Sequence, residues 1–290
     1  MRFRVLALSF AAVAIAVGAA GCRDRGAGPV DGYRVYAMEY GRSTGFRSSA
    51  LYRDAPDGSR EPISWYAWLV RGRGRTVLVD TGFASAEVAR KWKVTPFNPV
   101  PEMLERLGVA PDDVTDVVIT HLHWDHAGNT APYREARFWV PEADLAWARA
   151  RVNPERPERS GVRLGDVQAI DALETSGRLS AVAGEREVLP GITLHAGARH
   201  TGGILWAEVR TGRSDIPVVV LASDVAYLDK NVETLTPPGG TLDPEADLAQ
   251  IRRMLAVAKD GRWVVPGHDP LVMERFPKAA EGVVEITGKR

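Results

Sequence analysis

The segment ITHLHWDHAGN, residues 119–129, constrains the fold of this chain more than any other. It holds three of the six histidines of the 290-residue chain, together with an aspartate, within six positions. The β-branched run TDVVIT, residues 115–120, leads into it and predicts a buried strand. In extended chain, side chains two residues apart point the same way, so His121 and His123 can reach one ion. The segment therefore predicts a metal site at the end of a buried strand.

Further candidate ligands follow other predicted strands. Asp125 and His126 come where the chain turns towards a helix, close enough to reach a second ion. His200 in RHTGG, Asp224 in LASDVAY and His268 in VVPGHDP each follow an apolar strand. Imidazole and carboxylate groups are typical ligands of Zn²⁺ and related ions. Because α/β folds build their sites at the carboxyl edge of their strands, we expect these side chains to share one edge.

From residue 33 onward the chain alternates short strands with helices. No boundary divides it, which predicts one α/β domain over 33–290 with both faces of its sheets covered. Helices are expected at 99–108 and 244–259, and the region 153–186, polar and irregular at its start, is interpreted as a surface loop or lid. Strands are predicted at 33–38, 63–70, 75–83, 115–120, 191–197, 204–210, 216–223 and 262–267.

The hexapeptide PEADLA occurs twice, at 141–146 and 244–249. The residues that flank the two copies do not match, so an internal repeat is not inferred. Pro followed by Glu is a favoured start of a helix. Both copies are therefore interpreted as helix starts.

The N-terminal residues 1–21 have the pattern of a secretory signal peptide. Two arginines open the segment, an apolar stretch from Val5 to Ala20 follows, and small residues end it. Cys22, the only cysteine, comes next and resembles the acylated cysteine of bacterial lipoproteins; an ordinary signal peptide is the alternative. We expect an exported, membrane-attached lipoprotein on the periplasmic or cell-surface side, with residues 22–32 as the tether.

The charge balance limits the class of partner. Formal net charge is zero, from 37 basic and 37 acidic residues, and no long basic run appears. Nucleic-acid enzymes usually present a basic face, so no nucleic-acid partner is expected. The expected partner is a small-molecule substrate, and contact with a membrane is expected only through the N-terminal lipid anchor. The oligomeric state does not follow from the sequence.

Taken together, these residues resemble the metallo-β-lactamase superfamily over about residues 33–270. The similarity rests on HLHWDH, on the downstream ligand candidates in their order, and on Asp80 in VLVDTG. It implies a four-layer αββα sandwich with two divalent metal ions, expected to be Zn²⁺, at one edge. It implies that one ion is held by His121, His123 and His200, the other by Asp125, His126 and His268, and that Asp224 bridges them. Asp80 is expected either to orient a ligand or to be a simple turn residue.

Within that superfamily the chain looks most like the N-acyl homoserine lactone lactonases. SDVAYL places Tyr227 three residues after Asp224, as in those enzymes. The resemblance implies that Tyr227 hydrogen-bonds the substrate carbonyl and that Asp125 helps to protonate the leaving alkoxide.

True β-lactamases lack the bridging aspartate, and neutral charge disfavours a nuclease. One departure is the turn at His200, where Ala-Arg-His-Thr-Gly-Gly replaces the Thr-Pro-Gly-His of the lactonases.

The predicted activity is metal-dependent opening of lactone rings, with N-acyl homoserine lactones as the expected substrates. A thioesterase or other carboxylic-ester hydrolase of the same fold is the alternative. A binding protein that keeps the fold but lacks catalytic activity is disfavoured, because all seven candidate ligands are present. Phe46, Trp65 and Phe83 are candidates for an acyl pocket or for core packing. His195 has no place in the pattern and is interpreted as a strand residue.

Overall fold

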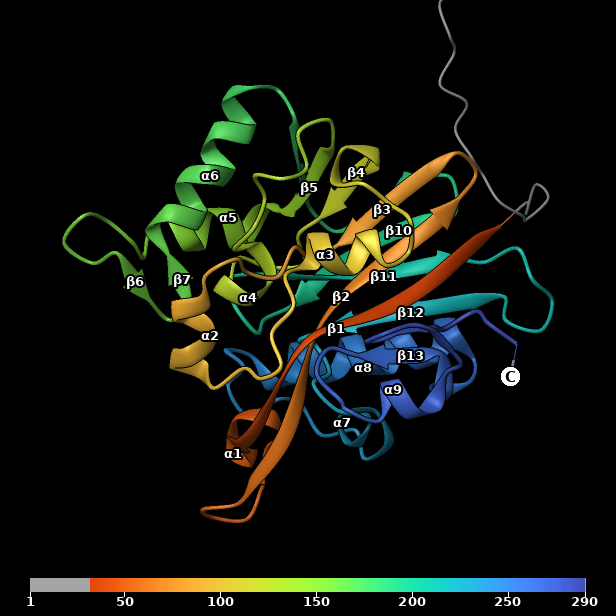
Figure 1. Cartoon of the computed structure of the whole chain (residues 1–290). Coiled ribbons are helices and arrows are strands. Elements are labelled where there is room, and N and C mark those ends of the chain that lie inside the picture. The colour runs from red at the N-terminus through yellow and green to blue at the C-terminus, as the bar shows by residue number, and fades with distance from the viewer. Residues whose placement is uncertain (1–31, 290) are drawn as a thin grey trace, which may run out of the picture.

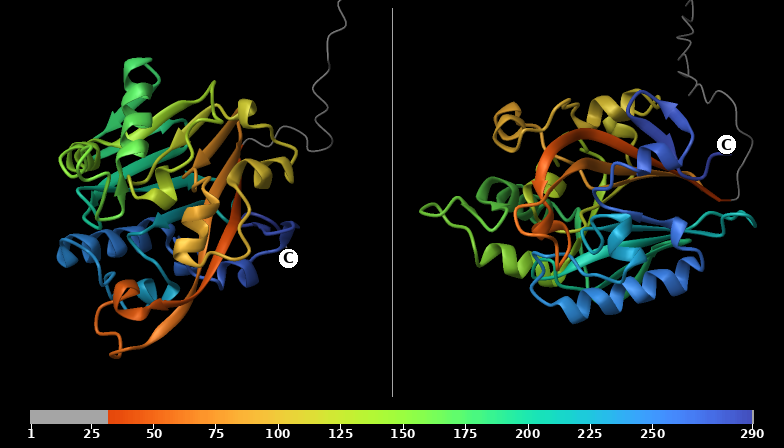
Figure 2. Two further views of the ribbon diagram at one scale, coloured as in Figure 1. Left: turned by 60° about the vertical axis from the view of Figure 1, so that its left-hand side comes forward. Right: turned by 90° about the horizontal axis from the view of Figure 1, so that it is seen from below.

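Two β-sheets stack face to face at the centre of the molecule, and helices cover both outer faces (Figures 1 and 2). The computed structural model describes residues 32–289. The expected signal peptide, Cys22 and the tether up to residue 31 lie outside the described residues. Among residues 32–289, none of the helices combines the length and apolar character needed to cross a membrane.

One sheet has eight strands in the order β14-β15-β1-β2-β3-β4-β5-β8. The bounds are β1 Tyr33–Arg47, β2 Arg60–Gly72, β3 Arg75–Val79, β4 Asp116–Val118, β5 Arg137–Pro141, β8 Leu179–Val182, β14 Lys278–Ala280 and β15 Val283–Glu285. Strands β3, β4, β5 and β8 run parallel, whereas β1 and β2 form a long antiparallel pair. The carboxyl ends of β3 and β4 therefore meet at one edge.

The second sheet has five strands in the order β13-β12-β11-β10-β9. Its strands are β9 Glu185–Leu189, β10 Ile192–Ala198, β11 Ile204–Arg210, β12 Val218–Ser223 and β13 Val264–Pro266. Strand β11 is antiparallel to both β10 and β12, and β12 is parallel to β13. Strands β10, β12 and β13 therefore share one direction and end at the same edge. A separate small hairpin joins β6 Glu158–Arg159 to β7 Val162–Arg163.

The helices complete a four-layer αββα sandwich, which confirms the fold class that the sequence predicts. Helix α8 packs its buried Ile251, Met254 and Ala258 on the five-stranded sheet, and Figure 2 shows it on that outer face. Helices α3, α5 and α6 contribute to the core on the outer face of the eight-stranded sheet. The bounds are α1 Ser48–Leu51, α2 Ala86–Trp92, α3 Val100–Glu105, α4 Trp124–Ala127, α5 Glu142–Arg149, α6 Leu164–Thr175, α7 Asp229–Glu233, α8 Pro244–Ala258 and α9 Val272–Arg275.

Strand β2 shows why the apolar run ISWYAWLV lacks polar alternation. Successive side chains of a strand point to opposite faces. Tyr66, Trp68 and Val70 join the core between the sheets, whereas Trp65, Ala67 and Leu69 join the core beneath the outer helices. Both faces of this strand are buried, so both are apolar.

The region 153–186 is more ordered than the interpretation as a surface loop or lid suggested. It contains the β6–β7 hairpin, helix α6 and strand β8. Val167, Ile170 and Leu173 repeat every three residues and form the buried side of α6, a spacing that sequence inspection overlooked. Strands β1 and β2 also run well past the predicted 33–38 and 63–70, because they pair with each other along their extensions.

Replacing Trp68 with Ala tests the core between the two sheets. Trp68 is fully buried, and removal of its indole is expected to lower the free energy of unfolding by about 3–5 kcal/mol. Denaturant unfolding followed by circular dichroism measures the change. Leu271→Ala is the control, because Leu271 is 52% exposed and its loss is expected to stay within about 0.5 kcal/mol. Equal losses of unfolding free energy in the two variants would contradict the packing of Trp68 between the sheets.

Candidate metal centre

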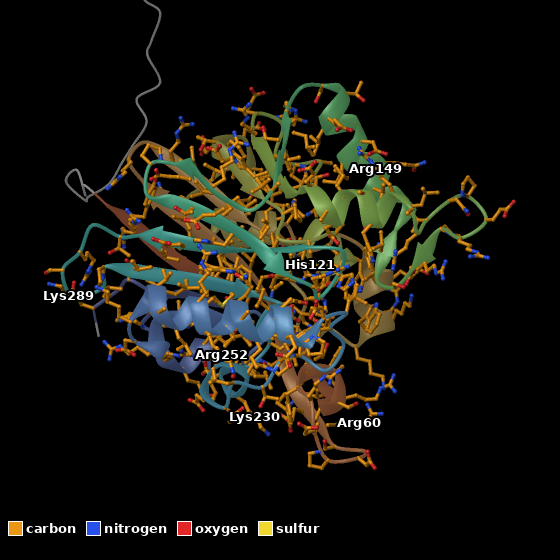
Figure 3. All side chains as sticks on the ribbon, turned by 180° about the vertical axis from the view of Figure 1, so that it is seen from behind. Arg60, His121, Arg149, Lys230, Arg252 and Lys289 are labelled. Atoms are coloured by element: carbon orange, nitrogen blue, oxygen red, sulfur yellow. The ribbon has the colours of Figure 1, made fainter. Side chains whose placement is uncertain are left out.

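The ends of four strands bring all seven predicted ligands to one place. Strand β4 leads into HLHWDH, β10 leads to His200, and β12 and β13 lead to Asp224 and His268. In Figure 3, His121 lies inside the fold near the tips of the strands of the five-stranded sheet. The ligand atoms form two groups, and within each group they lie within 4.8 Å of one another. The members are His121, His123, His200 and Asp224 in the first group, and Asp125, His126 and His268 in the second.

The ligand atoms of the first group are spaced as tetrahedral coordination of one ion requires. The Nδ1 atom of His123 lies 3.0 Å from Nε2 of His121 and 3.2 Å from Nε2 of His200. The Oδ2 atom of Asp224 lies 3.6 Å and 3.4 Å from the same two Nε2 atoms. Ligand atoms about 2.0–2.2 Å from a tetrahedral zinc ion lie roughly 3.4 Å apart. This group therefore fits Zn²⁺.

The second group shares Asp224 with the first. The Nε2 atom of His126 lies 3.0 Å from Oδ2 of Asp125 and 3.3 Å from Oδ1 of Asp224. The Nε2 atom of His268 lies 3.0 Å from the same Asp224 oxygen. His126 Nε2 is buried and has no hydrogen-bond partner among the described residues, as suits a nitrogen that binds an ion. Asp224 thus faces the two groups with different oxygens, as a bridging ligand does.

Hydrogen bonds from outside the groups orient two of the histidine rings. The Nδ1 atom of His126 donates to Oδ2 of Asp80 at 2.7 Å, and that of His268 donates to the carbonyl of Ser64 at 2.9 Å. Each bond leaves Nε2 free to face the ligand group. Thr120 also donates to Asp80 through its amide at 2.8 Å and through its hydroxyl at 2.9 Å. Of the two roles expected for Asp80, the structure supports orientation of a ligand.

His123 differs from the other histidines because its Nδ1 atom faces the group. Its Nε2 side lies against the turn between β6 and β7. A Cβ atom added to Gly161 in that turn would lie 2.7 Å from Cδ2 of His123, and Gly161 has a φ of +76°. The position therefore requires glycine, both for its backbone conformation and for the approach to the ring.

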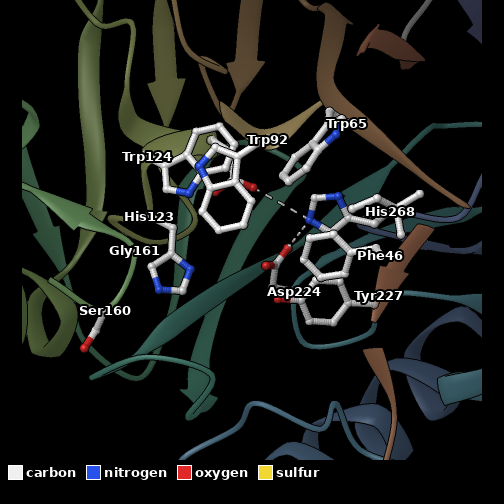
Figure 4. A pocket seen from close by; sticks show the side chains of 12 residues that line it. Phe46, Trp65, Trp92, His123, Trp124, Ser160, Gly161, Asp224, Tyr227 and His268 are labelled. Atoms are coloured by element: carbon white, nitrogen blue, oxygen red, sulfur yellow. Dashed lines mark hydrogen bonds and ion pairs between the residues drawn. The ribbon is translucent and has the colours of Figure 1, made fainter. Parts of the chain in front are cut away.

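A cavity of about 160 Å³ opens beside the two groups (Figure 4). Phe46 and Trp65 line it, as the acyl-pocket interpretation expects, whereas Phe83 is fully buried and belongs to the core. Trp92 and Trp124 also line the cavity and stack with ring centroids 5.1 Å apart, and sequence reasoning did not find them. Aromatic rings thus form much of the wall next to the ligands.

Tyr227 lines the same cavity as Asp224, the ligand candidate three residues before it (Figure 4). Its hydroxyl is 3.4 Å from Nε2 of His200, and its ring stacks on His268 with centroids 5.0 Å apart. Burial and the charge of Asp224 raise the pKa of Tyr227 well above its usual value. The phenol therefore keeps its proton and is available as a hydrogen-bond donor.

His195 is part of neither ligand group. It lies within β10, is buried, and stacks on Trp206 with ring centroids 3.8 Å apart. Its Nε2 atom is 3.3 Å from Oε2 of Glu208. Its partners are thus residues of the sheet.

Replacing Asp80 with Ala tests its contact with His126. Loss of a partner that orients a ligand is expected to weaken metal binding about 10–100-fold. Competition with a chromophoric chelator measures the affinity, and circular dichroism checks that the variant is folded. Asp112→Ala removes an exposed carboxylate and is the control. Unchanged metal affinity in Asp80→Ala would show that the contact has no role in binding.

Comparison with known proteins places the chain beside metal-dependent lactonases. Residues 64–268 match the family model described as the metallo-beta-lactamase superfamily. The N-acyl homoserine lactonase AiiB of Agrobacterium fabrum is 30% identical over 242 residues, which cover 77% of this chain and 85% of that protein. The crystal structure of a quorum-quenching N-acyl homoserine lactone lactonase has a TM-score of 0.69 at 24% identity, covering 83% of this chain and 94% of its own. AidC, a dizinc quorum-quenching lactonase in complex with a product, has a TM-score of 0.62 at 15% identity, covering 82% and 88%.

Proposed function

The chain belongs to the metallo-beta-lactamase superfamily, and from this we propose that it opens the ester ring of lactones, with N-acyl homoserine lactones as its substrates. As a member of that superfamily with both ligand groups, it is a metal-dependent hydrolase. The observation that carries the lactonase proposal is the position of Tyr227 in the cavity, with its hydroxyl 3.4 Å from Nε2 of His200. The 30% identity to the AiiB lactonase supports it.

The residues of the two groups are proposed to hold two Zn²⁺ ions. His121, His123 and His200 would hold one, Asp125, His126 and His268 would hold the other, and Asp224, which faces both groups, would contribute to each. When bound, such ions polarise a carbonyl and activate water at neutral pH. AidC, which resembles this chain in fold, is a dizinc protein, and the donor set of imidazoles and carboxylates suits zinc.

The protein's own side chains then act on the ester. The hydroxyl of Tyr227 donates a hydrogen bond to the carbonyl oxygen and stabilises it as negative charge develops there. A water molecule adds to the carbonyl carbon, and the carboxylate of Asp125, which also lines the cavity, accepts the proton that this water releases and passes it to the ring oxygen as the ester C–O bond breaks. The aromatic wall of Phe46, Trp65 and Trp92 binds the acyl substituent and excludes water.

A substrate panel tests the proposal and separates it from its alternative. Metal-replete protein that begins after the signal segment is assayed against N-acyl homoserine lactones of several acyl lengths, against thioesters, and against β-lactams. We expect turnover of the lactones and little or none of the β-lactams. Turnover of thioesters without lactones would favour the thioesterase. Absence of lactone turnover by protein loaded with two ions would refute the lactonase proposal.

Replacing Tyr227 with Phe removes the proposed donor and little else. Loss of one donor to an oxyanion typically lowers kcat about 10²–10³-fold, and we expect a loss of at least about tenfold here because the ions share the task. Steady-state kinetics gives kcat, and metal analysis verifies that two ions remain bound. Tyr133→Phe is the matched control, because its buried hydroxyl has no hydrogen-bond partner among the described residues. An unchanged kcat in Tyr227→Phe would remove this tyrosine from the mechanism.

We also propose that the protein is exported and anchored to a membrane through acylated Cys22. The support is the sequence pattern of residues 1–22 alone. In a bacterial host, the full chain is expected in the membrane fraction, whereas Cys22→Ser is expected to lose lipid modification and leave that fraction. Fractionation and the mass of the mature N-terminus provide the measurement. If the variant is processed and fractionates as the parent does, an ordinary signal peptide is the better explanation.

A further inference from the structure

The two PEADLA segments lie in the first turns of α5 and α8, and both touch the ligand loops. In Figure 3, α5, which ends at Arg149, and α8, which carries Arg252, flank His121 on opposite sides. The interpretation as helix starts is correct for both, since Pro141 precedes α5 and Pro244 opens α8. A good helix start, however, does not require the aspartate of each copy to be buried.

Both aspartates are fully buried and bind the same kind of partner. Asp144 accepts a hydrogen bond from the backbone N–H of Leu122 at 2.6 Å. Asp247 accepts one from the backbone N–H of Arg199 at 2.6 Å. Leu122 lies between His121 and His123, and Arg199 directly precedes His200. Each copy thus holds the backbone next to ligands of the first group.

The loop 199–203 is held from two sides. At one end, Arg199 is bound by Asp247, and its carbonyl accepts hydrogen bonds from the amide of Leu242 at 2.8 Å and the hydroxyl of Thr241 at 3.1 Å. At the other end, Gly202 and Gly203 pack on the first copy. A Cβ atom added at 202 would lie 2.1 Å from Cβ of Trp147 on α5 and 2.9 Å from the carbonyl oxygen of Ala143, and one added at 203 would lie 3.0 Å from Cβ of Ala143.

This arrangement accounts for the unusual turn at His200. Helix α5 lies so close, through Trp147 and Ala143, that a side chain at 202 has no room and one at 203 would be tightly packed, which favours the Gly-Gly that follows the histidine and Thr201. The backbone of this turn is held at Arg199 by the carboxylate of Asp247 and by the hydrogen bonds of Leu242 and Thr241 to its carbonyl. Because Asp247 is itself fully buried, its side-chain oxygen is a fixed acceptor for the N–H of Arg199, which suits a short loop that must present a ligand.

We propose that Asp144 and Asp247 are paired positioning residues that hold the two loops of the first ligand group. The repeated hexapeptide supplies the same carboxylate to each loop. The proposal rests on the proposed metal centre, and it assigns to α5 and α8 a role in holding the ligands of the first group. Neither aspartate belongs to a ligand group.

The test measures bound metal in full-length mature protein. Wild-type protein is expected to keep two zinc ions after dialysis against a weak chelator. Asp247→Ala is expected to keep one, because loss of a partner that orients a ligand weakens the first group about 10–100-fold and leaves the second group unchanged. Asp247→Asn is expected to keep both, since its amide oxygen still accepts the N–H of Arg199. Asp144→Ala and Asp144→Asn are expected to behave in the same way.

Two further variants identify the ion that is lost. Asp247→Ala combined with His268→Ala is expected to keep none, whereas Asp247→Ala combined with His200→Ala is expected to keep one. Glu142→Ala and Glu245→Ala are the matched controls, because each removes an exposed acidic residue from the same helix turn and is expected to keep both ions.

The outcomes separate the two proposals. Wild-type protein that binds no ions would refute the metal centre itself. Two ions in wild type and in Asp247→Ala would overturn the positioning role, as would equal loss from both ligand groups. Loss of the first group's ion from Asp247→Asn would also overturn the positioning role, because this variant keeps the hydrogen bond to Arg199 on which the role depends. Circular dichroism of each variant checks the fold.

Discussion

The contact of Asp224 with both ligand groups is the constraint on which the rest of the structure depends. Its two oxygens lie within 3.0–3.6 Å of nitrogens of four histidines, which come from three separate segments of the chain. Those segments belong to both sheets, so the sheets must stack in one register for the contacts to form. The parallel directions of β3 with β4, and of β12 with β13, are what bring these strand ends to a common edge.

The sequence predicted which side chains gather at this edge, because candidate metal ligands leave a local and unusual signature. Three histidines and an aspartate after a buried strand have few explanations, and the remaining ligands follow strands that are apolar throughout. Strand β2 was equally predictable, since burial of both faces produces a continuous apolar run. The fold class followed from the same signals.

What the sequence did not reveal depends on contacts between distant segments. Trp92 is on α2, a short helix that sequence inspection missed, and it reaches the cavity only by stacking on Trp124. Phe83 was as good a candidate as Phe46 from residue type alone, yet one is core and the other lines the cavity. Asp247 looked like an ordinary first-turn acid, because its partner lies 48 residues away in the chain.

The position of the long β1–β2 pair bears on which substitutions the cavity wall can accept. It extends past the sheet and carries Phe46 and Ile63 to the cavity, although the pair contributes none of the seven ligands (Figure 1). The pair therefore adds side chains to a cavity wall that also includes Trp124 from the ligand segment and Tyr227 beside Asp224. Under the proposed function, substitutions at Phe46 or Ile63 would alter the part of the wall that meets an acyl group and leave every ligand side chain in place, so substrate range could change without loss of the metal centre.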